Sequence, residues 1–299
     1  MDIHWYPGHM TKTRRMIQAD LKLVDLVAEV IDARIPISSR NPDIDELVGD
    51  KPRLIILNRA DQADPEQTKA WTRWFKEKGC AVLETDSKTG GGVNQFSAVI
   101  QDVLREQITR WREKGQVGRP VRVMVVGVPN VGKSTFINKV AKRKSAKAGD
   151  RPGVTRGKQW VAVAAGLDLL DTPGILWPKF EDQTVGRNLA FTGAIKDEVM
   201  DAETLACYLM ETLAERYPQA LLERYKLELP PRAEYEGAGP LSYGYDLLER
   251  AARKRGFLIS GGEPDTERMA KVLLDEFRAG KLGRFTLETP DGAAAYDNV

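Results

Sequence analysis

The fold of this chain is decided by the stretch Gly127-Val128-Pro129-Asn130-Val131-Gly132-Lys133-Ser134-Thr135. It reads G-x-x-x-x-G-K-S, the P-loop pattern that cradles nucleotide phosphates. A β-branched run over residues 121–126 leads into it, and a helical pattern over 135–144 leads out. Because the motif requires a strand before it and a helix after it, these flanks favour a phosphate site over a glycine-rich turn that binds nothing.

Each residue type in this loop has a chemical reason to be there. Gly127 and Gly132 let the backbone curl so that successive N–H groups face phosphate oxygens. The helix expected to begin near Lys133 adds the positive end of its dipole, and the Lys133 ammonium should reach the β- and γ-phosphates. The Ser134 hydroxyl should hold Mg²⁺, an ion that prefers oxygen ligands. The loop residues expected to bind the nucleotide are Asn130, Val131, Gly132, Lys133, Ser134 and Thr135.

A second motif, Asn58-Arg59-Ala60-Asp61, follows the apolar run 53–57. An aspartate such as Asp61 can accept hydrogen bonds from guanine N1–H and from the exocyclic amine, groups that adenine cannot present together, so such a site rejects adenine. Asn58 should brace neighbouring loops. Arg59 stands where the usual motif has lysine, and it can stack over the base. After the next predicted strand, Thr85-Asp86-Ser87-Lys88 is where a backbone N–H to guanine O6 belongs.

A third motif, Asp171-Thr172-Pro173-Gly174, follows another strand pattern. The Asp171 carboxylate can bind Mg²⁺ through water, and the Gly174 N–H can meet the γ-phosphate. Thr155, within a basic loop, is the natural second hydroxyl ligand of Mg²⁺. Together these elements predict a GTP hydrolase that binds GTP and GDP with Mg²⁺.

The order of these loops along the chain is unusual. In ordinary GTPases the phosphate loop comes first, whereas here the guanine loops at 58 and 85 precede the phosphate loops at 127, 155 and 171. Ligand loops gather at the carboxyl ends of parallel strands whatever their order in the chain. The prediction is therefore an α/β fold, a circularly permuted P-loop GTPase domain with a doubly wound, mostly parallel sheet, followed by a small all-helical domain.

The domain boundaries follow from a change of pattern. Strands alternate with helices up to the third motif, which is typical of a parallel sheet covered on both faces. From about residue 201 the pattern is helical throughout, with no strands between. We expect a GTPase domain over 1–185, a C-terminal helical domain over 186–288 and a disordered tail over 289–299.

Composition adds mild constraints. The 299 residues carry 45 Lys and Arg against 43 Asp and Glu, a net charge of +2 that does not itself indicate a nucleic acid partner. The run 139–158 is different, because it holds eight basic residues and one acid beside the phosphate loop; a solvated face is the plainer interpretation. Two isolated cysteines, the lack of an apolar leader and the lack of a membrane-length run predict a cytoplasmic protein. A monomer is expected.

Several segments of the chain, together with the loop order, resemble a known protein family. The start Trp5-Tyr6-Pro7-Gly8-His9-Met10, the Asp32-Ala33-Arg34 turn, the permuted order and the helical tail resemble the ribosome biogenesis GTPase A (RbgA/YlqF) family. The resemblance covers residues 1 to about 288. It implies a cytoplasmic factor that acts late in assembly of the large ribosomal subunit, with ribosomal RNA and proteins as partners.

Hydrolysis should be slow without help. Ile175 follows Gly174, where Ras-like GTPases place a glutamine that orients water, and isoleucine cannot do this. The resemblance suggests Asn130 as a ligand of K⁺, which would replace an arginine finger, and His9 as a catalytic group. A histidine can orient water near neutral pH, but packing at the amino end explains His9 equally well. We therefore expect an enzyme that is slow alone and activated by the ribosomal particle.

The helical domain is the expected RNA- or ribosome-docking part. Its cations are Arg250, Arg253, Lys254, Arg255, Lys271, Arg278, Lys281 and Arg284. Acidic residues are as numerous there, so a solvated surface or a protein-binding module stays open. Two other classes are possible: a GTP-dependent protein-binding switch without RNA contact, and a metabolic P-loop kinase, against which Asp61 argues.

Overall fold

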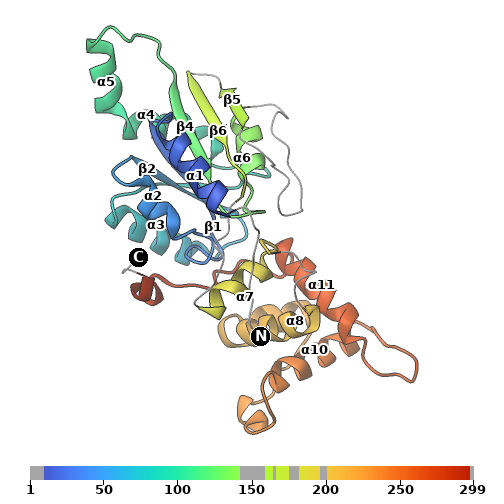
Figure 1. Ribbon diagram of the computed structural model, residues 1–299. Helices are drawn as coiled ribbons and strands as arrows, with labels where there is room; N and C mark the ends of the chain where they lie inside the picture. The colour runs from blue at the N-terminus through green and yellow to red at the C-terminus, as the bar shows by residue number, and fades with distance from the viewer. Residues whose placement is uncertain (1–9, 142–158, 164–165, 175–181, 196–200, 297–299) are drawn as a thin grey trace.

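The computed structural model describes residues 10–141, 159–163, 166–174, 182–195 and 201–296 (Figure 1). Its strands are β1 (Leu26–Asp32), β2 (Arg53–Asn58), β3 (Ala81–Thr85), β4 (Val121–Val126), β5 (Gln159–Val163) and β6 (Leu167–Asp171). The helices up to the phosphate loop are α1 (Met10–Leu21), α2 (Asp43–Val48), α3 (Pro65–Glu77), η1 (Val93–Gln95), α4 (Phe96–Val103), α5 (Arg105–Glu113) and α6 (Lys133–Val140). The later helices are α7 (Gln183–Phe191), α8 (Ala202–Arg216), α9 (Pro218–Tyr225), η3 (Arg232–Tyr235), α10 (Ser242–Lys254), α11 (Thr266–Arg278) and η4 (Pro290–Tyr296).

The six strands form one sheet in the order β3-β2-β1-β4-β6-β5. All neighbouring pairs are parallel except β5 with β6, so the predicted mostly parallel sheet is confirmed. The strand before the P-loop, β4, pairs with β1 and β6 at the centre. Because β1, β2, β3, β4 and β6 run the same way, the loops after them meet at one edge of the sheet.

Helices cover both faces of this sheet (Figure 1). Successive side chains of β1 point to opposite faces, and every residue of the strand is buried, as expected of a parallel strand between two helical layers. Val27 packs with residues of α1 and α2, and Ile31 packs with Trp71 and Phe75 of α3. On the other face, Val30 belongs to the core that contains residues of α4 and α6.

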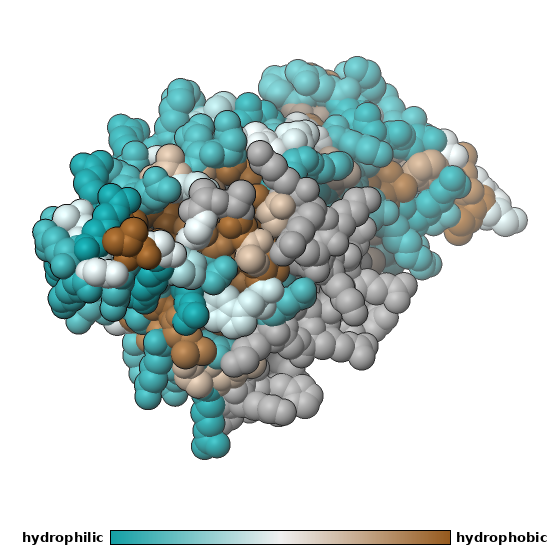
Figure 2. All heavy atoms as spheres, turned by 90° about the horizontal axis from the view of Figure 1, so that it is seen from above, coloured by the Kyte–Doolittle hydropathy of each residue, from teal (hydrophilic) through white to brown (hydrophobic). Residues whose placement is uncertain are grey.

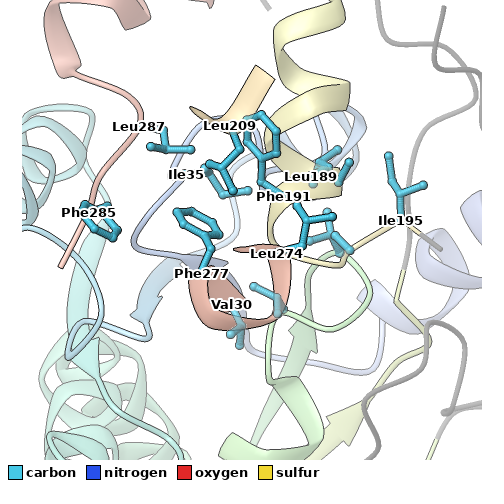
Figure 3. Close-up of a cluster of buried hydrophobic side chains, with 14 of the residues drawn as sticks. Val30, Ile35, Leu189, Phe191, Ile195, Leu209, Leu274, Phe277, Phe285 and Leu287 are labelled. Carbon is cyan, nitrogen blue, oxygen red and sulfur yellow. The ribbon is translucent and has the colours of Figure 1, made fainter. Parts of the chain in front are cut away.

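The later helices form a separate layer next to the carboxyl edge of the sheet (Figure 1). Helices α8, α10 and α11 pack on one another, and the helical patterns predicted after residue 201 are confirmed. Figure 3 shows the junction, where Val30 and Ile35 meet Phe191, Leu209 and Phe277. One hydrophobic core therefore runs from the sheet into the helical domain, and α7 spans the boundary predicted at residue 185.

The prediction of a disordered tail from residue 289 is wrong for the part of it that the structure describes. Residues Pro290–Tyr296 form the short helix η4, which lies beside α3 (Figure 1). Ala293 is buried in the cluster that contains Trp71 and Phe75, and the Trp71 indole N–H donates to the Glu288 carbonyl at 3.1 Å. The small and polar residues of this segment give no sign of the contact in the sequence. Its partner, Trp71, is more than 200 positions away in the chain.

In the view of Figure 2, hydrophilic residues cover most of the described surface, and hydrophobic residues show as smaller patches. Val117, Leu258 and Ile259 are among the large hydrophobic residues with substantial exposure. Among the residues that the structure describes, every helix is too short or too polar to cross a lipid bilayer.

Candidate nucleotide site

The P-loop lies between β4 and α6, as the motif requires. Gly127 has φ 149° and Gly132 has φ 102°, both in the region that favours glycine. A Cβ on Gly127 would collide with the Val30 carbonyl, and one on Gly132 would collide with the Asn58 side-chain amide. Both glycines are therefore required by close approach of neighbouring groups as well as by backbone conformation.

Lys133 is buried inside this loop. Its ammonium donates to the carbonyl oxygens of Gly127 and Val128, both at 3.0 Å. Burial lowers the pKa of Lys133 to about 8, although the Asp171 carboxylate opposes the shift. A buried ammonium that donates to two carbonyl oxygens and lies near one carboxylate is electrostatically suited to anionic phosphate oxygens, which would raise its pKa again.

Ser134 and Asp171 come together from separate motifs. The Ser134 hydroxyl donates to Asp171 Oδ2 at 3.2 Å, and sheet register sets Asp171 beside Val125, just before the P-loop. Burial raises the pKa of Asp171, while Lys133 and Ser134 lower it. The buried Oδ1 atom of Asp171 has no hydrogen-bond partner among the described residues. A hydroxyl and a carboxylate with one unpartnered buried oxygen fit Mg²⁺, which binds through such groups together with substrate phosphates.

Asn58 joins the phosphate and guanine loops. Its Nδ2 donates to the Val131 carbonyl at 2.8 Å. Its Oδ1 accepts from the Ser87 hydroxyl at 2.7 Å, the Ser87 N–H at 3.1 Å and the Thr85 hydroxyl at 3.2 Å. Parallel register places Asp32, Asn58 and Thr85 in one row at the sheet edge. Asn58 therefore braces three loops that are far apart in the sequence.

Arg59 forms a second connection to the P-loop. Its guanidinium donates to the Asn130 carbonyl at 2.8 Å and lies 3.7 Å from an Asp32 oxygen. Although burial opposes charge on Asp32, Arg34 and Arg59 outweigh it and hold the pKa of Asp32 below its usual range. The described contacts of the Arg59 guanidinium thus connect its own loop to the P-loop and to Asp32 at the end of β1. Stacking of Arg59 on the base remains a prediction.

The two aspartates of the guanine loops have opposite environments. Partial burial and the nearby Asp86 carboxylate raise the pKa of Asp61, although its own backbone N–H and the charges of Arg34 and Arg59 oppose the shift. Asp86 accepts from the backbone N–H of Lys88 at 2.9 Å and of Thr89 at 3.2 Å. Despite partial burial, these bonds and that from the Thr89 hydroxyl lower the pKa of Asp86. Asp86 therefore closes its own turn, and Asp61 is the carboxylate better placed to accept from a ligand.

Two further predicted groups lie beside the P-loop. A Cβ on Gly174 would collide with the Pro129 backbone, so the loop after β6 packs closely on the phosphate loop. Asn130 has φ 56°, and its side-chain amide donates to the Gly193 carbonyl after α7 at 2.9 Å. His9, Thr155 and Ile175 lie outside the described residues, so their predicted roles stay predictions, as does the K⁺ role of Asn130.

Known proteins resemble this chain in sequence and in fold. A family model described as 50S ribosome-binding GTPase matches residues 122–225, a segment that begins in β4 and leaves the guanine loops outside it. Ribosome biogenesis GTPase A of Bacillus cereus is 46% identical over 291 residues, which cover 97% of this chain and 95% of that protein. The chain belongs to the ribosome biogenesis GTPase A family.

Other members and solved structures agree. Ribosome biogenesis GTPase A of Thermotoga maritima is 32% identical over 96% of this chain and 94% of its own length. GDP-bound YlqF matches with a TM-score of 0.64 and 30% identity, over 93% of this chain and all of that one. GNP-bound YlqF of T. maritima matches with a TM-score of 0.61 and 31% identity, over 94% and 99%. As a member of this family, the protein described in Figure 1 is a GTP hydrolase with a circularly permuted fold, and it acts in ribosome biogenesis.

The sequence alone did not reveal how the helical domain is tied to the nucleotide loops. Buried Arg34 forms a two-bond ion pair with Asp32, at 2.8 and 2.9 Å, and donates to the Phe277 carbonyl of α11 at 3.1 Å. Arg278 donates to the Phe191 and Ala190 carbonyls, and Arg255 pairs with Glu276. Several cations expected to dock RNA therefore make contacts within the protein. The Asp32-Ala33-Arg34 turn was visible as a motif, but its partner on α11 was not.

Proposed function

We propose that this protein is a GTP-hydrolysing assembly factor for the large ribosomal subunit, slow alone and activated by the ribosomal particle. The observation that carries the nucleotide half is the Asn58 side chain, which bonds the P-loop and the Thr85–Ser87 loop into one site. The large subunit is supported by the description of the matching family model, which names 50S ribosome binding.

Within this proposal each loop has one task. Asp61 accepts from guanine, while Lys133 and the P-loop N–H groups bind the phosphates. Ser134, Asp171 and Thr155 would hold Mg²⁺, which would neutralise phosphate charge when bound. The Gly174 N–H meets the γ-phosphate, so that loss of this phosphate releases the loops at Thr155 and Gly174 and switches the protein between two states.

Slow intrinsic hydrolysis follows from Ile175, which has no polar atom with which to orient water. The particle would bind the basic run 139–158 and bring His9 toward the γ-phosphate. K⁺ at Asn130 would add positive charge at the transition state. Activation of tenfold requires only about 1.4 kcal/mol of additional transition-state stabilisation.

The docking surface combines the basic run with the helical domain, and cytoplasmic location and a monomeric state complete the proposal. A GTP-dependent protein-binding switch without RNA contact is the second candidate. It is favoured by one observation: Arg255, Arg278 and other cations of the helical domain bond to acidic groups or carbonyls of the protein itself. Phosphate contacts by the remaining cations would make binding strongly salt-dependent through counterion release, whereas binding to a protein partner should depend on salt less steeply.

The test is single-turnover GTP hydrolysis with purified large subunits, small subunits or neither. We expect at least tenfold acceleration by large subunits, with loss of most of it in His9→Ala at unchanged GTP binding. Co-sedimentation with GTP and with GDP, across a salt series, separates the two candidates. Absence of both stimulation and co-sedimentation would refute the large-subunit proposal, and equal stimulation of His9→Ala would limit His9 to packing.

A further inference from the structure

A short segment of the C-terminal chain lies along the loop that carries Asp61. We call residues 284–288 the C-terminal strap. The Arg284 guanidinium donates to the carbonyl oxygens of Ala60 and Ala63, both at 2.8 Å. The Phe285 N–H donates to the Gln62 carbonyl at 2.9 Å. The strap therefore bonds to the peptide groups on both sides of Asp61.

The contact continues past the loop. The Asp64 N–H donates to the Thr286 hydroxyl at 3.2 Å, and that hydroxyl lies 3.3 Å from the Ala33 carbonyl. Against the same loop, a Cβ on Gly280 would press into the Gln62 side chain, so helix α11 also ends close to it. The loop that carries Asp61 is thus held in place by residues that follow helix α11 of the helical domain.

The strap itself is anchored without Arg284. Phe285 is buried and stacks on Phe277, with ring centroids 6.0 Å apart and planes 11° apart. The Leu287 N–H donates to the Arg34 carbonyl at 2.7 Å, and the Glu288 carboxylate accepts from the Ile37 and Ser38 N–H groups. Arg284, by contrast, is exposed. Its removal should therefore leave the strap in place and free only the loop carbonyls.

We propose that Arg284 is a positioning residue for guanine recognition, which sets the Asp61 loop through the Ala60 and Ala63 carbonyls. The inference rests on the proposed role of Asp61. Guanine presents two donors side by side, and one carboxylate must face both at once. A loop pinned at two carbonyls by one rigid, planar fork can hold that geometry. Because Arg284 belongs to the strap, the helical domain and the base site are energetically linked, and the linkage acts in both directions.

The experiment compares affinities for GTP and ITP, since the inosine base keeps N1–H and lacks the exocyclic amine. Arg284→Ala should weaken GTP binding about fivefold, change ITP binding less, and so reduce the GTP-to-ITP preference. Arg284→Lys should recover part of the preference, because an ammonium can donate to these carbonyls without the fork geometry. The matched control is Arg110→Ala, which removes an exposed arginine of α5 that pairs with Glu106.

The readouts separate positioning from general loss of structure. Unfolding midpoints of Arg284→Ala and Arg110→Ala should agree, and Arg110→Ala should bind both nucleotides as the parent protein does. An unchanged GTP-to-ITP preference in Arg284→Ala would overturn the inference. Asp61→Asn is titrated in parallel with GTP and XTP: a shift toward XTP together with an unaffected Arg284→Ala would refute only the strap's role. If Asp61→Asn keeps its GTP preference, the proposed guanine site itself is wrong.

Discussion

Asn58→Ala tests whether the two halves of the nucleotide site form one bonded unit. The side chain is buried and makes four hydrogen bonds, one to the Val131 carbonyl and three from Thr85 and Ser87. Each buried hydrogen bond contributes about 1 kcal/mol net, and a partner left unsatisfied costs more. With the bond from Thr85 long at 3.2 Å, we expect a loss of about 3 kcal/mol in the free energy of unfolding.

The effect on ligand binding should exceed that of an ordinary core change. The P-loop carbonyl at Val131 and the Ser87 N–H would no longer share one partner, so the phosphate and guanine loops could move apart. We expect GDP affinity to fall about tenfold, equivalent to about 1.4 kcal/mol. Urea unfolding measures the first quantity and titration with a fluorescent GDP analogue measures the second.

A double-mutant cycle provides the control. Ser87→Ala removes the hydroxyl donor at 2.7 Å but keeps the backbone donor, so it should cost about 1 kcal/mol by itself. If the two residues interact directly, Asn58→Ala and Ser87→Ala together should cost about 1 kcal/mol less than their sum. A loss below about 1 kcal/mol in Asn58→Ala, or strict additivity with Ser87→Ala, would refute the reasoning.

Three other outcomes follow from the site and its junction. Lys133→Ala should abolish GTP hydrolysis, because the buried ammonium is the charge proposed to bind the phosphates; normal turnover in a phosphate-release assay would remove Lys133 from the mechanism. Hydrolysis should be faster in K⁺ than in Na⁺ at equal ionic strength, as Asn130 suggests; equal rates with and without ribosomal subunits would exclude the ion. Arg34→Ala should cost about 3 kcal/mol in urea unfolding, since it removes the guanidinium that bonds twice to the buried Asp32 carboxylate and leaves Arg59, 3.7 Å away, as a weaker partner. A loss no larger than that of exposed Arg105→Ala would contradict this.

Local pattern was sufficient for the sheet, the loops and the helical domain. The strands predicted before the three motifs are β2, β4 and β6, because β-branched and apolar runs ending in polar loop residues are typical of buried parallel strands. The helices after residue 201 follow from their apolar periodicity. Asp171 and Ser134 were also assigned from their motifs, and the structure brings them together at 3.2 Å.

What the sequence by itself determined is therefore the permuted α/β fold and the family, and it supplied a predicted chemistry for each nucleotide loop. Only the tertiary structure decided how those loops are held: Arg284 on the Ala60 and Ala63 carbonyls, Arg34 on the Phe277 carbonyl, and Ala293 packed near Trp71. Motifs and periodicity report on residues within a turn or a few positions. These contacts join residues more than 200 positions apart. The acceptors of both arginines are backbone carbonyls that every residue carries, so no side-chain pattern identifies these bonds in advance.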